Sequence, residues 1–116
     1  MQKKRTFYVR DKKTVWAYLE YDVVQAVFAL HIRRDLDISN TSIQLYAYTS
    51  AGYYDLNPEM SLRWVQDRLI PPNRANIGDI LREGGLTEYS EIGMIDLHKG
   101  RCVQDDLYLE EYFAEK

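Results

Sequence analysis

Few side chains in this sequence are of a type that serves as a nucleophile or a metal ligand. The chain has one cysteine, Cys102, and two histidines, His31 and His98. His98 stands four residues before Cys102, across a glycine, and a reactive thiol needs such a neighbouring base. We nevertheless interpret Cys102 as a small buried thiol. Because these three residues show no CxxC or HExxH spacing, we expect no metal site.

The paired carboxylates and the Gly-Gly pair also match no catalytic or phosphate-binding motif. Carboxylates occur in adjacent pairs at residues 105–106 and 110–111, and neighbours on a strand point to opposite faces. Gly84-Gly85 lacks the GxxxxGK pattern of a phosphate-binding loop and follows a predicted helix instead of opening one. The sequence therefore predicts a protein that is not an enzyme and has no catalytic residue and no cofactor.

Two arginines flank the one proline pair in the chain: Arg68 precedes Pro71-Pro72 and Arg74 follows it. If their guanidinium groups are exposed, they are candidate contacts for a partner. If they are internal, they anchor nearby carboxylates, with Asp105 or Asp106 among them. The full set of candidate partner-binding residues is Trp64, Arg68, Arg74 and Arg101.

The N-terminal half shows the alternation of apolar and polar residues that is typical of strands. Residues 5–10 and 14–21 predict two strands, and the polar turn at residues 11–13 joins them into a hairpin. Residues 22–32 fit a helix or a strand, and their valines, phenylalanine and isoleucine favour a strand. Residues 42–49 alternate again and predict another strand. We therefore expect an antiparallel sheet in this half.

Three short helices are expected in the C-terminal half. The first begins with Asn57 as its N-cap and ends at Pro71-Pro72, since the residue before a proline leaves the helical region. The second covers residues 73–83, with Asn73 as a cap and two glycines at its end. The third is capped by Thr87, with Ser90 or Glu91 at the reciprocal capping position, and ends at residues 98–100.

A final strand over residues 106–112 should return to the sheet, with Leu107 and Leu109 as its buried residues. The sum is an α+β fold that occupies residues 1–116 as one domain. Cations gather near the start of the chain and carboxylates near its end. We expect these charges to offset each other if the two ends lie side by side in the sheet; the alternative is a basic patch for a partner.

Composition limits the classes of partner and the cellular location. The net charge of −3 predicts neither a broad affinity for nucleic acid nor attraction to a membrane surface. A single cysteine fits the reducing cytoplasm. No apolar run approaches the ~20 residues of a membrane helix. The sequence leaves the oligomeric state open.

Three successive helices also raise the alternative of a helix-turn-helix DNA-binding regulator. The candidate recognition helix, residues 89–98, carries Glu91 and Asp96, which would repel phosphates. The proline pair is also unlike the usual tight turn of that motif. We therefore keep DNA binding as an alternative and do not expect a nucleic-acid partner.

The stretch from Ser61 to Tyr108 resembles a segment near the start of HipA-like serine/threonine kinases of Gram-positive bacteria. The residues that carry the resemblance are Leu62, Trp64, Arg68, Ile70, Pro71, Asn73 and Arg74, then Leu81, Gly85 and Leu86, then Ile92, Ile95, Asp96, Lys99, Gly100 and Arg101, then Asp106 and Tyr108. The resemblance covers under half of the chain.

In the family this segment precedes the kinase core, whereas here no Gly-rich loop and no catalytic Asp motif follows it. The resemblance therefore implies a separate copy of a non-catalytic kinase subdomain, without kinase activity. In three-part HipA-like toxin–antitoxin systems, a small protein similar to that subdomain acts with the kinase in trans. The expected function is thus a protein-interaction module that binds and regulates such a kinase. A phage or mobile-element inhibitor of a host defence enzyme is a further alternative.

Overall fold

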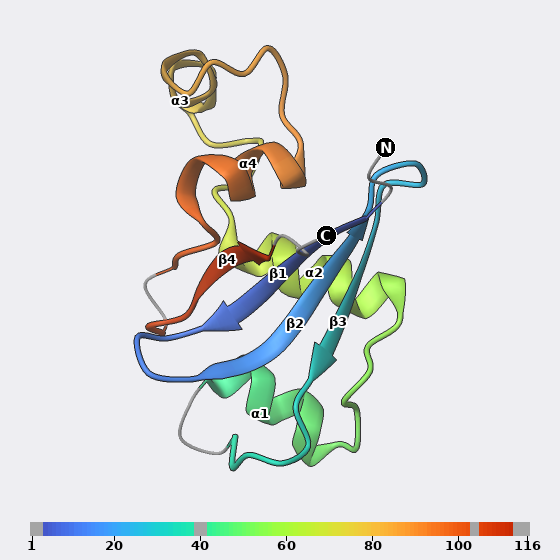
Figure 1. Cartoon of the computed structure of the whole chain (residues 1–116). Coiled ribbons are helices and arrows are strands. Elements are labelled where there is room, and N and C mark those ends of the chain that lie inside the picture. The colour runs from blue at the N-terminus through green and yellow to red at the C-terminus, as the bar shows by residue number, and fades with distance from the viewer. Residues whose placement is uncertain (1–3, 39–41, 103–104, 113–116) are drawn as a thin grey trace.

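The computed structural model describes residues 4–38, 42–102 and 105–112. Within this part of the chain, four strands form one antiparallel sheet with the order β3-β2-β1-β4, and four helices accompany it (Figure 1). The strands are β1 (Lys4–Arg10), β2 (Val15–Asp22), β3 (Val27–Ile32) and β4 (Tyr108–Tyr112). The helices are α1 (Ile43–Ser50), α2 (Pro58–Arg68), α3 (Ile77–Glu83) and α4 (Glu91–His98). The predicted α+β class is confirmed.

The sheet is built from two hairpins whose turns are fixed by aspartates. In the β1–β2 turn, Asp11 Oδ1 accepts hydrogen bonds from the backbone N–H groups of Lys13 and Thr14, each at 2.8 Å. In the β2–β3 turn, Asp22 Oδ1 accepts from two backbone N–H groups in the same way. The preference for a strand within residues 22–32 is therefore confirmed for β3, while residues 23–26 form the turn.

One face of the sheet packs on α1 and α2, and the other face carries no described element (Figure 1). Alternate residues of each strand point into the core, where they meet Leu45 of α1 and Trp64 and Val65 of α2. The buried strand residues are Phe7, Val9, Ala17, Leu19, Phe28, Leu30, Ile32 and Leu109. A two-layer arrangement of this kind leaves the outer face of the sheet free for other contacts.

The two ends of the chain meet in the sheet, because β4 pairs antiparallel with β1. Arg5 bonds Glu111 through two hydrogen bonds of 2.7 Å, and Arg10 lies 3.0 Å from Glu110. The expected offset of terminal charges is confirmed for these pairs. The two arginines of β1 are therefore used internally.

The prediction of a strand over residues 42–49 is wrong, because this segment forms helix α1. Ser42 caps the helix by accepting a hydrogen bond from the N–H of Leu45. Leu45 and Tyr48, three residues apart, pack on the core, whereas Ile43 is 89% exposed. The apolar residues that alternated in sequence thus lie on different sides of a helix, so their alternation did not report a buried face.

Three C-terminal helices are confirmed: α2 starts where predicted, and α3 and α4 start later than predicted. Asn76 is the residue before α3, so that helix begins at Ile77 and not at Asn73. Ser90 caps α4 by accepting from the N–H of Gly93, so Thr87 is not the cap. The returning strand begins at Tyr108.

Both outer edges of the sheet are occupied by other parts of the chain. On β3, the N–H of Leu30 donates to Ser61 Oγ at 2.9 Å, the N–H of Leu56 donates to Leu30, and the N–H of Ile32 donates to Tyr54. On β4, the N–H of Leu109 donates to the carbonyl of Lys99 at 2.7 Å. The sheet therefore offers little open backbone for an added strand.

Replacing Ser61 with alanine should destabilise the protein by about 1–3 kcal/mol, since the fully buried hydroxyl also donates to Leu56 and its loss leaves two backbone groups without partners. Chemical denaturation of Ser61→Ala measures this loss. Ser50→Ala is the control, because Ser50 is an exposed residue at the end of α1. Equal stabilities of the two variants would contradict the role of Ser61 at the β3 edge.

Candidate functional site

The guanidinium group of Arg68 is internal and joins three parts of the chain. Its side chain is 1% exposed and holds Asp105 through two hydrogen bonds of 2.8 and 2.9 Å. It also donates to the carbonyls of Gly100 at 2.8 Å and Leu107 at 3.1 Å. The guanidinium lies 5.0 Å from the ring centre of Trp64. Arg68 therefore ties the end of α2 to the segments before β4, as the anchoring alternative predicted.

Asp105 is the acceptor at the centre of this joint. Burial alone would raise the pKa of Asp105, but hydrogen bonds and charge attraction from Arg68, with the N–H of Leu107, lower it below its usual value. The ionised form thus stabilises the fold above the pKa that the carboxyl has in the unfolded chain. That stabilisation is lost as pH falls through the lower pKa of the folded state.

The four predicted partner-binding residues do not form one surface. Trp64 is fully buried in the core, and Arg68 is internal as described. Arg74 and Arg101 are exposed, and neither has a carboxylate partner among the residues that the structure describes. Arg68 and Arg101 border a common cavity of about 230 Å³, whereas Arg74 lies in the connection between α2 and α3. Of the four, Arg74 and Arg101 are available to a partner.

The residues with nucleophilic or metal-binding side chains are also separate. Cys102 Sγ lies 3.9 Å from Asp105 Oδ1, so the thiol meets a carboxylate that Arg68 already holds. His31 lies on β3, far from Cys102 in the sequence, and its ring nitrogens contact Glu20 and Asp55 instead. Within the described residues, no group of three histidine, cysteine or acidic side chains could hold a metal ion.

A row of tyrosines on the uncovered face of the sheet is the feature that the predicted site residues do not include. Tyr8 lies between Tyr18 and Tyr112, with ring centres 5.6 and 5.4 Å away. Tyr18 is 37% exposed and Tyr112 is 43% exposed. Burial raises the pKa of Tyr8, and its two tyrosine neighbours add to this. We call Tyr8, Tyr18 and Tyr112 the tyrosine face.

A sequence signal for this face existed. The alternation in residues 14–21 places Tyr18 opposite the apolar residues Ala17 and Leu19, and ten tyrosines in 116 residues are an unusual number for a chain of this size. Tyrosine suits half-buried sheets and interfaces, because its ring is apolar and its tip is polar. What the sequence could not show is that strands β1, β2 and β4 bring three of these rings together.

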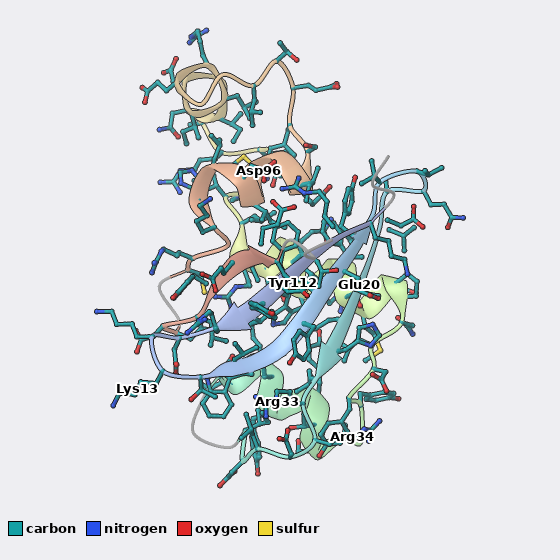
Figure 2. All side chains as sticks on the ribbon, viewed as in Figure 1. Lys13, Glu20, Arg33, Arg34, Asp96 and Tyr112 are labelled. Carbon is teal, nitrogen blue, oxygen red and sulfur yellow. The ribbon has the colours of Figure 1, made fainter. Side chains whose placement is uncertain are left out.

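Charged groups surround the tyrosine face and are largely paired. His31 lies 3.2 Å from Glu20 and 2.9 Å from Asp55, and Arg34 lies 3.1 Å from Asp55. Hydrogen bonds from His31 and Arg34 lower the pKa of Asp55. Glu20 and Tyr112 are seen on the viewer's side of the strands, opposite α1 and α2 (Figure 2). The centre of this face is thus aromatic and its border is ionic.

The tyrosine face presents amphipathic rings on a sheet, and rings of this kind suit a binding surface. Among the described residues, no helix has the length and apolar character to cross a membrane. Comparisons of the chain with protein-family models, with curated proteins and with solved structures find no match.

Proposed function

We propose that this chain is a non-enzymatic protein-interaction module that binds its partner through the tyrosine face. The observation that carries the proposal is that two exposed tyrosine rings pack on either side of a third, half-buried one, on a sheet face that no described element covers. Tyrosine is enriched where protein interfaces bury their strongest contacts, because it offers a large apolar area and a hydrogen-bonding tip at low entropic cost.

Charges around the tyrosine face favour a protein over a nucleic acid. Arg10 and Arg34 at its border already pair with Glu110 and Asp55, so these cations are not free to bind phosphates. In α4, the candidate recognition helix, Asp96 is exposed and bonds Arg5 at 2.7 Å. Both observations support protein binding over the DNA-binding alternative.

A HipA-like kinase is the partner that we propose, on the resemblance of residues 61–108. Several residues that carry this resemblance are internal: Trp64 is buried, and Arg68 bonds the carbonyl of Gly100. Such residues would preserve the fold of a kinase subdomain, while the tyrosine face makes the contact. An inhibitor of a host defence enzyme would use the same face, and the identity of the bound enzyme separates these two proposals.

The test compares tyrosines on opposite sides of the molecule. Tyr18→Ser with Tyr112→Ser removes two exposed rings of the tyrosine face, and Tyr46→Ser removes a 47% exposed ring from α1. Titration calorimetry with the purified HipA-like kinase of the same host measures binding. We expect the double variant to lose at least ~100-fold in affinity, as for two interface hot spots, and Tyr46→Ser to bind normally.

Matched thermal melts exclude a folding defect in either variant. Kinase binding that the double variant retains would contradict the tyrosine face as the contact. Absence of binding to the kinase by the unchanged protein would reject that partner. Retention on duplex DNA that falls steeply with added salt would instead favour the DNA-binding alternative.

A further inference from the structure

Two cavities lie beside β4 and share the pair formed by Arg101 and Tyr108. The larger, of about 740 Å³, lies between the β1–β2 turn and the residues that lead into β4. The smaller, of about 310 Å³, lies between β4 and the C-terminal part of α4. Arg101 and Tyr108 line both cavities. We call the two cavities with this pair the Arg101 groove.

Four cations that line the groove have no carboxylate partner among the residues that the structure describes. They come from the β1–β2 turn and from the end of α4, and the turn extends Lys13 away from the sheet (Figure 2). Among the described residues, none of them has a carboxylate within ion-pair distance, in contrast to Arg5, Arg10 and Arg68. The free groove cations are Lys12, Lys13, Lys99 and Arg101.

Carboxylates that line the groove are mostly in use within the protein. Arg68 holds Asp105, and Arg10 holds Glu110. The groove carboxylates that accept hydrogen bonds from the protein's own N–H groups are Asp11, Asp96, Asp105, Glu110 and Glu111. Asp106 is the exception among the described residues of the lining. Because the groove cations are unpaired within the described part of the chain and most of its carboxylates already accept hydrogen bonds, a negatively charged group from another molecule can bind there.

Arg101 is oriented for such a group. Its guanidinium carbon lies over the ring of Tyr108, 4.5 Å from the ring centre. No carboxylate among the described residues pairs with this guanidinium, so its N–H donors remain available. Those donors match the two oxygens of a carboxylate or phosphate, and less entropy is lost when the arginine is already oriented.

We propose that the Arg101 groove binds an acidic segment of the protein partner, with one carboxylate or phosphate on Arg101 and others near Lys12, Lys13 and Lys99. This inference rests on the proposed protein-binding function. Tyr108 and Tyr112 belong to the same strand and point to the same side of the sheet, since they are four residues apart. Tyr108 thus links the groove to the tyrosine face, and one partner can contact both.

A peptide fits this groove better than a nucleic acid does. A phosphodiester backbone carries a charge at every nucleotide and would bring phosphates close to Asp106 and the neighbouring carboxylates. A peptide can place its charges at the cations and neutral side chains elsewhere. The acidic group is a glutamate or aspartate carboxylate, or a phosphorylated side chain, and both share the same chemistry.

The experiment uses the full-length protein and labelled ten-residue peptides in fluorescence anisotropy. One peptide alternates glutamate and serine, a second replaces glutamate with glutamine, and a third carries phosphoserine. A ten-nucleotide single-stranded DNA is the fourth probe. The protein variants are Arg101→Gln, Asp106→Asn and the control Arg74→Gln, which removes an exposed arginine outside the groove.

We expect the glutamate or phosphoserine peptide to bind and its glutamine counterpart to fail. Arg101→Gln should weaken binding by ~10-fold or more, because it removes a charge-assisted pair of hydrogen bonds. Asp106→Asn should strengthen binding by roughly 2-fold, because it removes the charge of the one carboxylate in the described lining that accepts no hydrogen bond from the protein. Arg74→Gln should change nothing. The stronger of the two acidic peptides identifies carboxylate or phosphate as the natural group.

Equal binding by Arg101→Gln and the unchanged protein would overturn the inference, as would no binding of either acidic peptide at millimolar concentration. DNA that binds at least as tightly as the peptides would overturn the choice of a protein segment. Failure here is distinguishable from failure of the proposed function. If only the groove inference fails, Arg101→Gln still binds the kinase, while the tyrosine double variant loses it. If only the proposed tyrosine contact fails, the acidic peptide binds, and the tyrosine double variant retains every protein partner.

Discussion

Replacing Arg68 with alanine should destabilise the fold by about 3–5 kcal/mol, because the change leaves Asp105 buried without its counter-charge. It also removes the donors to the carbonyls of Gly100 and Leu107. Urea denaturation at neutral pH measures the loss. The corresponding control is Arg74→Ala, since Arg74 is exposed and its removal should change the free energy of unfolding by less than ~0.5 kcal/mol.

We attribute this loss of stability to the broken Arg68–Asp105 pair and not to the missing arginine alone. In the double variant Arg68→Met with Asp105→Leu both charges are absent, so most of the lost stability should return, as for other buried ion pairs replaced by apolar residues. The double variant should also lose one source of acid sensitivity. In the unchanged protein the low pKa of Asp105 makes stability fall as pH drops below the usual range of aspartate, and this contribution is absent without the carboxylate.

Two outcomes would contradict this account of the joint. A loss in Arg68→Ala no larger than that in Arg74→Ala would mean that the pair is not structural. Normal stability together with lost partner binding would return Arg68 to the role of a contact residue. The first comparison needs no partner, so it tests the fold independently of the proposed function.

Local signals in the sequence predicted the elements with a clear start and stop. Asn57 accepts a hydrogen bond from the N–H of Met60 at 2.8 Å and Pro58 follows it, so α2 begins where predicted. Hairpin β1–β2 was equally clear, because period-two alternation and a polar turn agree. These features depend on neighbours within a few residues, which a sequence displays directly.

Helix α1 shows where local reasoning fails. The alternating Ile43, Leu45 and Ala47 fit a strand, but both sheet edges are already occupied by Ser61, residues 54–56 and Lys99. The segment therefore forms a helix that buries Leu45 and exposes Ile43. No pattern inside residues 42–49 reports that the edges are taken, since that fact depends on segments elsewhere in the chain.

The candidate surfaces were predictable to different degrees. Arg101 was selected from sequence and is exposed, but its stacking on Tyr108 depends on how α4 leads into β4. The tyrosine face depends on register, because Tyr8 pairs with Tyr18 in one hairpin and with Glu110 across the returning strand. A sequence gives the number of tyrosines and their alternation. The partner strands that bring them together are set by tertiary structure.

Replacing Trp64, another of the predicted contact residues, should cause the second large loss of stability. It is the largest fully buried side chain, and it belongs to the core cluster between α2 and the sheet. Trp64→Ala should cost about 3–5 kcal/mol, because a cavity replaces an indole ring. It also removes the aromatic face that lies against Arg68, so part of the loss should overlap with that of Arg68→Ala.

Trp64→Phe separates burial from the indole N–H. Trp64 Nε1 has no hydrogen-bond partner among the described residues, so replacing it with a carbon ring sacrifices volume but no hydrogen bond. We expect Trp64→Phe to remain folded and to lose less than half as much stability as Trp64→Ala in urea denaturation. If the tyrosine face makes the contact, Trp64→Phe should also bind the partner normally. Weaker binding by Trp64→Phe at unchanged stability would show instead that the partner reaches Trp64 by opening the core, which would move the contact from the sheet to α2.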